Sequence, residues 1–251
     1  MPDALNPRTR RARALKAPIA SRDAVNGSFP RGARRSRETR ARLLDAALQL
    51  VAANGLSSVT INEITAAADV GFGSFYNHFE SKEGIFTALI EWLFEEFANS
   101  LDRLAAGLSD PAEVIAVSVR HTLLRAHREP VWGQLLIREG LSPRALSRGL
   151  GLRLLRDSEK GISERRFVIA DRLVSVISVI GTVLAGIAGE LQLALSSKRT
   201  VRARKALRSK EEKFAQRTAA IVLQAFGLPR VEAERIARRP LPSVPAGQTL
   251  P

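Results

Sequence analysis

Apolar residues at helical spacing define the first ordered part of this chain. Leu43, Ala47, Leu50 and Val51 recur three or four positions apart, which predicts a helix with one apolar face. Asn54-Gly55 follows, and glycine there allows the left-handed conformation in which helices commonly end. No convincing run of strand-like alternation appears downstream. The pattern therefore predicts an all-α fold.

Three short helices are predicted between about residues 40 and 80. Thr60-Ile-Asn-Glu63 is a capping box that starts the second helix, at about residues 61–68. Asp69-Val70-Gly71 interrupts this helix, and the helical pattern resumes from Phe72 to Phe79, before Ser81 caps a further helix. Three helices with a tight turn between the last two are the plan of a helix-turn-helix unit. The last of these three helices, which is the second of the helix-turn-helix pair, enters the major groove.

The segment from Gly71 to Lys82 holds the only Tyr and three of the ten Phe residues. Phe75, Phe79 and Phe86 are expected in the core because aromatic residues at helical spacing usually pack inward. Small residues would let the helix backbone approach DNA closely, namely Gly71, Gly73 and Ser74. Phosphate contacts are expected from Tyr76, His78 and Lys82, although Tyr76 alone would fit a half-buried ring equally well. Candidates for base contacts are Asn62, Phe72 and Asn77.

The remainder of the chain reads as further helices. A helix begins near Ser81, and Asp110-Pro111 caps another that runs to Arg128. Two long helices are predicted at about residues 167–195 and 210–226, and a short one follows. We therefore expect a helix-turn-helix domain at residues 37–82 and a helical ligand-binding and dimerisation domain at residues 83–240.

Leu173 to Gly189 is an apolar stretch of 17 residues without a charge. It falls just short of the ~20 residues of a membrane-spanning helix, so a buried interface helix is favoured and no membrane partner is expected. Ala185 and Gly189 would permit close helix approach in either setting. The residues predicted at a dimer interface are Val176, Ile180, Ala185, Gly189 and Ile221.

Net charge points to a polyanionic partner. The formal charge is +14 and the isoelectric point is near 11.3, which favours nucleic acid first and an anionic membrane surface second. Residues 1–36 contain four Pro and no periodicity, so they are predicted to be a disordered basic arm. Whether this arm is only a solvated tail or adds non-specific DNA affinity stays open. Residues 241–251 are predicted to be a flexible tail.

Enzymatic and metal chemistry find little support. The chain has no Cys, so disulfides and Cys-based zinc sites are excluded and the cytoplasm is the expected compartment. Phosphate-binding loops, dinucleotide fingerprints and nucleophile elbows are absent, and no cofactor is expected. His121 and His127 lie on different faces of their helix, which argues against a metal site. Candidates for a ligand pocket, for which ordinary core or surface placement is the alternative, are Trp92, His121, Arg125, Trp132 and Arg138.

The stretch "TINEITAAADVGFGSFYNHFESKEGIF" resembles the DNA-binding region of TetR-family transcriptional regulators, over residues 38–86. Asp69 stands where Gly is usual, and Gly71 stands where Ser often caps the recognition helix. Asp tolerates the left-handed conformation, so the fold is retained. The resemblance implies DNA-backbone contacts from Thr60, Ser74, Tyr76, His78 and Lys82. It implies base contacts from Asn62, Gly71, Phe72 and Asn77.

The resemblance also implies a function, which is sequence-specific transcriptional regulation. We expect a homodimeric repressor that binds a palindromic double-stranded DNA operator and is released by an unidentified small-molecule effector. The alternative is a non-specific, charge-driven protein that binds nucleic acid or anionic membranes. That alternative predicts a steep salt dependence without preference among DNA sequences.

Overall fold

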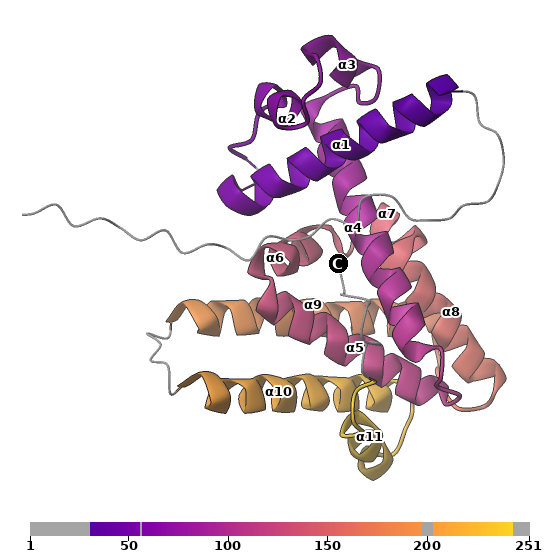
Figure 1. Ribbon diagram of the computed structural model, residues 1–251. Coiled ribbons are helices and arrows are strands. Elements are labelled where there is room, and N and C mark those ends of the chain that lie inside the picture. Colours follow the sequence, from indigo (N-terminus) through magenta and orange to yellow (C-terminus); the bar gives the residue numbers. More distant parts are fainter. Residues whose placement is uncertain (1–30, 56, 197–202, 243–251) are drawn as a thin grey trace, which may run out of the picture. The chain divides into compact units, whose positions relative to one another are not determined.

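The computed structural model describes residues 31–55, 57–196 and 203–242, and every regular element among them is a helix (Figure 1). The all-α prediction is confirmed. The chain divides into two compact units, with the boundary after Leu89. This boundary lies inside helix α4 (Lys82–Ala105), whereas the sequence placed a domain boundary at the start of that helix. The predicted arm up to residue 30 and most of the predicted tail lie outside the described residues.

The first unit contains α1 (Arg31–Asn54), α2 (Ile61–Ala67), α3 (Phe72–Tyr76) and the start of α4. Gly55 ends α1 with a φ of 81°, as its sequence predicts. The capping box of α2 is present, with the Thr60 side chain accepting from the Glu63 N–H while the Glu63 carboxylate accepts from the Thr60 N–H. The Ser81 hydroxyl likewise accepts the Gly84 N–H at the start of α4.

Two boundaries of the first unit differ from their predictions. The prediction of disorder is wrong for residues 31–36, which form the first turns of α1. Arg is a good helix former, Pro30 is the last proline before this segment, and Arg34 pairs with Glu38 one turn later. Helix α3 ends at Tyr76 rather than Phe79, because the chain must turn before Ser81 caps α4.

The core of the first unit joins its helices around Phe75, which is fully buried. Phe79 and Phe86 are also buried, so the expected core placement of these three aromatics is confirmed. Other fully buried members are Leu43, Ala47, Ile64 and Ile85. Burying a large apolar side chain contributes about 1.5–3 kcal/mol to folding stability. This packing fixes the orientation of α3 on the other helices of the unit.

An arginine holds the turn between α2 and α3. The Arg42 Nε of α1 donates to the Ala68 carbonyl at 2.9 Å, and its Nη2 also contacts the Ala68 and Asp69 carbonyls. Asp69 has a φ of 50°, the left-handed conformation that its sequence position predicts. The guanidinium therefore satisfies carbonyl groups at the point where the chain leaves α2.

In its described residues, the second unit contains the rest of α4 and seven further helices. They are α5 (Pro111–Arg128), α6 (Pro130–Glu139), α7 (Pro143–Ser147), α8 (Gly149–Ser163), α9 (Arg172–Ser196), α10 (Ala203–Ala225) and α11 (Arg230–Ala237). Helix α5 is central, because it packs against α6, α8, α9, α10 and α11. Helices α9 and α10 run side by side (Figure 1). Asp110 caps α5 as predicted, accepting the Ala112 N–H at 2.9 Å.

The start of α9 corrects a sequence prediction, because the helix begins at Arg172 and not at Phe167. Phe167 lies in the preceding loop but is buried, with its ring 4.9 Å from that of Phe226. A Cβ at Gly161 would come within 2.1 Å of this ring, so glycine there makes room for it. Phe167 is apolar because it packs in the core, and its spacing from the apolar residues of α9 extended the helical pattern in the sequence beyond the true start of the helix.

Helix α9 is apolar enough to cross a membrane by length and composition. The segment Arg172–Gln192 has a mean hydropathy of 1.9, and 22% of its most apolar window is buried within the chain. Its exposed side chains include Leu173, Val174 and Ile177, and Ile221 is exposed on α10. One chain thus leaves apolar surface on both of its long late helices.

Candidate DNA-reading surface and ligand cavity

Helix α3 presents two aromatic side chains to solvent. Phe72 is 50% exposed and Tyr76 is 51% exposed, and their rings meet edge to face with centroids 5.5 Å apart. The buried Phe75 ring packs against Tyr76 at 5.4 Å. Gly73 is exposed with no other atoms near the position of a Cβ, which permits close approach to a duplex. This geometry supports the predicted reading role of α3.

The other residues predicted to contact DNA differ in how exposed they are. Asn62, Gly71 and Asn77 are exposed, whereas Ser74 and His78 are half-buried. Gly71 is the N-cap residue of α3 and provides no side-chain cap, as the replacement of Ser implies. Asn77 is the C-cap residue of α3 rather than a residue within the helix.

Two of the predicted phosphate contacts already have partners within the chain. The Thr60 hydroxyl donates to the Glu63 carboxylate at 2.8 Å, and hydrogen bonds from Thr60 lower the pKa of Glu63. The Lys82 ammonium donates to the Ser57 carbonyl at 3.2 Å and lies 5.6 Å from the centre of the Phe86 ring. Both groups therefore help to build the surface, besides any contact with DNA.

A cavity of about 110 Å³ lies inside the second unit. Its walls are mainly apolar, and the polar side chains that reach it come from three helices. The apolar lining includes Phe94, Leu101, Val114, Ile115, Leu136, Leu150, Leu154, Val179, Ile180 and Val183. The polar lining consists of Asp102, Ser118, Thr122, Arg153 and Asp157. An apolar cavity with a few convergent polar groups is typical of a small-molecule site.

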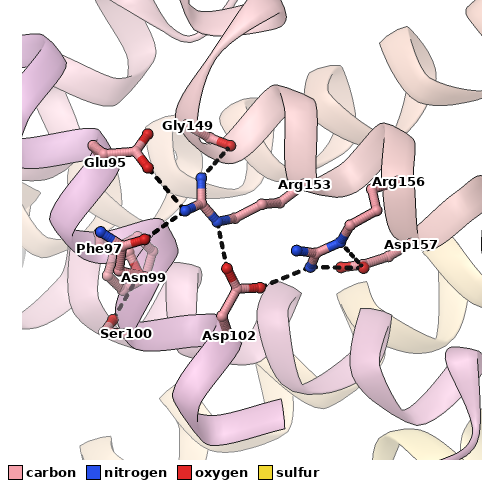
Figure 2. Close-up of polar contacts among 9 residues, drawn as sticks. All are labelled: Glu95, Phe97, Asn99, Ser100, Asp102, Gly149, Arg153, Arg156 and Asp157. Atoms are coloured by element: carbon pink, nitrogen blue, oxygen red, sulfur yellow. Dashed lines mark hydrogen bonds and ion pairs between the residues drawn. The ribbon is translucent and has the colours of Figure 1, made fainter. Parts of the chain in front are cut away.

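Charged side chains join α4 to α8 (Figure 2). Three of them line one wall of the cavity, Asp102, Arg153 and Asp157. The Arg153 Nε donates to Asp102 at 2.6 Å, and its Nη2 donates to Glu95 at 2.8 Å and also contacts Asn99. Arg156 bridges the other Asp102 oxygen, at 2.7 Å, and Asp157, at 2.8 Å. The three carboxylates and two guanidinium groups form one continuous network.

The network is held in its charged form. Burial alone would raise the pKa of Asp102, but hydrogen bonds from Arg156 and Arg153 outweigh it and lower the pKa. Burial would likewise lower the pKa of Arg153, but Glu95 and Asp102 raise it. The cavity therefore ends at a wall that can accept a hydrogen bond through Asp102 or Asp157 and donate one through Arg153.

None of the five sequence-predicted pocket residues lines this cavity. Trp132 and Arg125 are buried in the core, where the guanidinium lies 4.8 Å from the ring centres of both Phe97 and Trp132. His121 is also buried, on the same helix as Arg125, and burial lowers its pKa to about 4. Trp92 is half-buried.

Arg138 is exposed and pairs with the neighbouring Glu139 at 3.1 Å. The pocket prediction relied on aromatic and basic residue types, but these particular residues are used in packing and at the surface. The residues that sequence reasoning missed, Asp102 and Arg153, are 51 positions apart. The only local signal was Arg153, Arg156 and Asp157, which lie within two turns of one helix.

The residues predicted at a dimer interface fall into two groups, one facing inward and one exposed. Val176 is only 2% exposed, and Ile180 lines the cavity, so the structure does not favour these two at a surface between subunits. They face inward because α9 packs on α5, α6 and α8. Ala185, Gly189 and Ile221 are exposed.

No cluster of three His, Asp or Glu residues suited to a metal ion occurs among residues 31–55, 57–196 and 203–242.

Comparison with known proteins agrees with both units. Residues 43–89 match the family described as bacterial regulatory proteins, tetR family, and residues 110–239 match the tetracyclin repressor-like C-terminal domain. A solved structure of RolR in complex with resorcinol is similar, with 36% identity and a TM-score of 0.66. That match covers 84% of this chain and 98% of the RolR chain.

Curated relatives match mainly at the N-terminal end. The transcriptional repressor DhaR of Mycobacterium sp. (strain GP1) is 36% identical over 95 residues, which cover 38% of this chain and 46% of DhaR. The regulator AcrR of Shigella flexneri is 34% identical over 89 residues, 35% of this chain and 41% of AcrR. The chain thus spans less than half the length of these curated relatives. They are transcriptional regulators, which supports the expectation that the protein is not an enzyme. From the helix-turn-helix unit, the two family matches and the extent of the likeness to RolR, we conclude that the chain belongs to the TetR family of transcriptional regulators.

Proposed function

We propose that the protein is a homodimeric repressor released from its operator by a small hydroxylated aromatic compound. The observation that carries this proposal is the cavity of the second unit, where apolar walls end at the charged network of Arg153, Asp102 and Asp157. A repressor that binds chromosomal operators acts in the cytoplasm, which is the compartment expected here.

The cavity suits one aromatic ring with polar substituents. A cavity of about 150 Å³ accommodates benzene, and the volume here, about 110 Å³, is somewhat smaller, so a single ring is the largest aromatic group that it suits and side chains of the lining must move to admit it. Phenolic hydroxyl groups would donate to the Asp102 or Asp157 carboxylate and accept from Arg153, while the ring contacts apolar side chains. RolR, at 36% identity, has been solved with resorcinol. This likeness supports the same ligand class here.

Ligand binding is proposed to act through α4. Asp102 and Arg153 join α4 to α8, and α4 is one helix from Lys82 to Ala105. A hydroxyl group that competes for Asp102 would change the contacts of α4, whose first turns belong to the DNA-reading unit. Such coupling typically amounts to ~1–3 kcal/mol between the two binding events.

The DNA-bound form is proposed to place two copies of α3 in successive major grooves. Two-fold symmetry would make the operator an approximate palindrome, with half-sites about 34–36 Å apart or a multiple of that distance. Exposed apolar residues on α9 and α10 supply a surface for dimerisation. They are Val174, Ile177, Ala185, Gly189 and Ile221.

The test begins with selection of binding sites from a randomised DNA pool at near-physiological salt. The proposal expects an inverted repeat, and the charge-driven alternative expects no preferred sequence. Release from the selected operator is then measured with resorcinol, phenol and benzene. Resorcinol should release the protein at the lowest concentration, because it offers two hydroxyl groups to the charged wall.

The variant Asp102→Asn tests the charged wall. It should retain operator binding but need about 10- to 100-fold more resorcinol, the equivalent of losing a hydrogen bond to a charged group. Glu159→Gln is the matched control, since Glu159 is an exposed residue of α8 that pairs with Arg172 and does not line the cavity. If benzene releases the protein as well as resorcinol does, the hydroxylated ligand class is wrong.

A further inference from the structure

Among the described residues of the first unit, positive charge is concentrated at the start of α1. Within residues 31–89, six of the seven Lys and Arg residues lie between Arg31 and Arg42, and the seventh is Lys82. The same range contains six Asp and Glu residues, of which only Glu38 falls among those arginines. The first turns of α1 therefore form a basic helical segment.

A DNA-binding surface needs cations near its reading helix. A duplex has one negative charge per ~1.7 Å of its axis, and proteins neutralise phosphates with Lys and Arg. The reading motif, residues 60–82, supplies only Lys82 as a permanent cation. The Lys82 ammonium already donates to the Ser57 carbonyl. Among residues 31–89, the other cations all lie on α1.

Two arginines of α1 connect the basic segment to the reading motif. The Arg40 guanidinium lies 4.9 Å from the centre of the Phe79 ring, just beyond α3, and Arg42 donates to the carbonyl groups of the turn before α3. Both therefore have structural contacts on the side of α1 that faces the motif.

Three exposed arginines precede these contacts on the same helix, Arg34, Arg35 and Arg37. With a rise of 1.5 Å per residue, they lie about 5–9 Å along α1 from Arg40. At 100° per residue they occupy about half of the helix circumference. The pair between Arg34 and Glu38 is exposed, and such pairs contribute little, so it does not prevent Arg34 from binding a phosphate.

We propose that Arg34, Arg35 and Arg37, the α1 arginine ridge, bind the phosphodiester backbone of DNA that flanks the half-site read by α3. This proposal rests on the proposed function in one respect, which is that α3 binds DNA. The ridge adds affinity and length to the footprint without reading bases, because phosphate contacts position a protein but do not specify sequence.

Duplex DNA fits the ridge better than a membrane does. A helix that lies on a membrane needs a broad apolar face, and residues 31–39 contain only Ala33 as an apolar side chain apart from Gly32. Arginine presents a planar fork that matches phosphate oxygens in pairs. Three arginines on a rigid helix can therefore follow a phosphate backbone.

The test compares the full chain with the variant Arg34→Gln/Arg35→Gln/Arg37→Gln. Affinity is measured over a series of salt concentrations, on the selected operator with short and long flanks and on a duplex of random sequence. The control Arg230→Gln/Arg235→Gln/Arg238→Gln makes the same charge change at exposed residues of α11 and the residue after it. A second variant, with lysine at the three ridge positions, retains the charge, and circular dichroism checks that α1 remains helical.

We expect the ridge variant to reduce the slope of log affinity against log salt by up to about 2.7, since each phosphate contact contributes ~0.9. The advantage of long flanks should disappear, while the preferred sequence stays the same. The lysine variant should retain most of the slope, and the α11 control should match the wild type.

Equal slopes for the ridge variant and the wild type would overturn the proposal, as would an equal loss in the α11 control. Loss of binding to vesicles rich in phosphatidylserine, with an unchanged DNA slope, would assign the ridge to membranes instead. The random duplex separates the two proposals. If selection finds no operator but the ridge variant loses slope on random DNA, the repressor function fails and the ridge contact stands.

Discussion

The two units of this protein carry their functional residues in different ways. In the first unit, the caps, the turn and the exposed aromatics of the reading surface all lie between Thr60 and Lys82. In the second unit, the network at the cavity joins residues 51 to 58 positions apart. A local motif can therefore be recognised from sequence, whereas the cavity exists only after α4, α5, α8 and α9 have packed together.

The largest effect should come from removing one core aromatic in each unit. Phe75→Ala and Phe97→Ala each delete a side chain that is at most 2% exposed, which typically costs ~3–5 kcal/mol. If the units carry separate functions, Phe75→Ala should abolish operator binding yet retain resorcinol binding, measured by calorimetry. Phe97→Ala should reduce resorcinol binding first. Equal loss of both activities in both variants would show that the units are not separable.

A pH effect of up to ~3 kcal/mol is expected from Glu190 in the second unit. Burial, with the neighbouring Glu211, raises the pKa of Glu190 from 4.5 to about 7, and each pKa unit corresponds to ~1.4 kcal/mol. Between these values the folded chain holds a proton that the unfolded chain releases, so stability falls as pH rises. Glu190→Gln should remove this fall and be more stable than wild type at pH 7.5, as measured by urea unfolding.

His121 provides the opposite trend for the same experiment. Its pKa is lowered from 6.5 to about 4 by burial, with the charges of Arg128 and Arg120 adding to the effect. Its contribution to stability is therefore lost as pH falls from about 6.5 to 4. His121→Gln should flatten the acid side of the wild-type curve, and an unchanged acid side would show that His121 ionises normally.

Removing a connecting arginine from each unit should cost ~1–3 kcal/mol, the range for hydrogen bonds with charged groups. Arg42→Gln loses the bonds to the turn before α3, and half of this side chain is exposed, so its cost lies at the low end. It should weaken operator binding and leave ligand affinity unchanged. Arg153→Gln should do the reverse and weaken resorcinol binding. If Arg42→Gln altered ligand affinity, the two units would not carry separate functions.

The smallest effect should come from helix caps. Thr60→Ala removes the capping box of α2, and Ser142→Ala removes the cap of α7, where the hydroxyl accepts the Ala145 N–H. Each loss costs ~1 kcal/mol of stability by denaturant titration. Only Thr60→Ala should also weaken operator binding. A similar weakening by Ser142→Ala would mean that the cap effect is general destabilisation.

Several features were predictable because their causes are local. The capping box at Thr60, the helix end at Gly55 and the left-handed Asp69 depend on residues within a few positions of each other. The inward placement of Phe75 and Phe79 follows from helical spacing. The start of α1 was missed because charge and nearby prolines suggested disorder, while the i to i+4 pair of Arg34 and Glu38 and good helix propensity favour helix.

The sequence by itself determined the family, the helical class and the reading motif, because short-range hydrogen bonds and periodicity encode them. Tertiary structure alone decided which charged residues of different helices meet. Arg125 was a pocket candidate by type but lies against the rings of Phe97 and Trp132 in the core, whereas Arg153 is held at the cavity wall by Asp102, Glu95 and Asn99. Two arginines with similar local surroundings in sequence differ only in which helices pack against them, and that packing depends on the whole core.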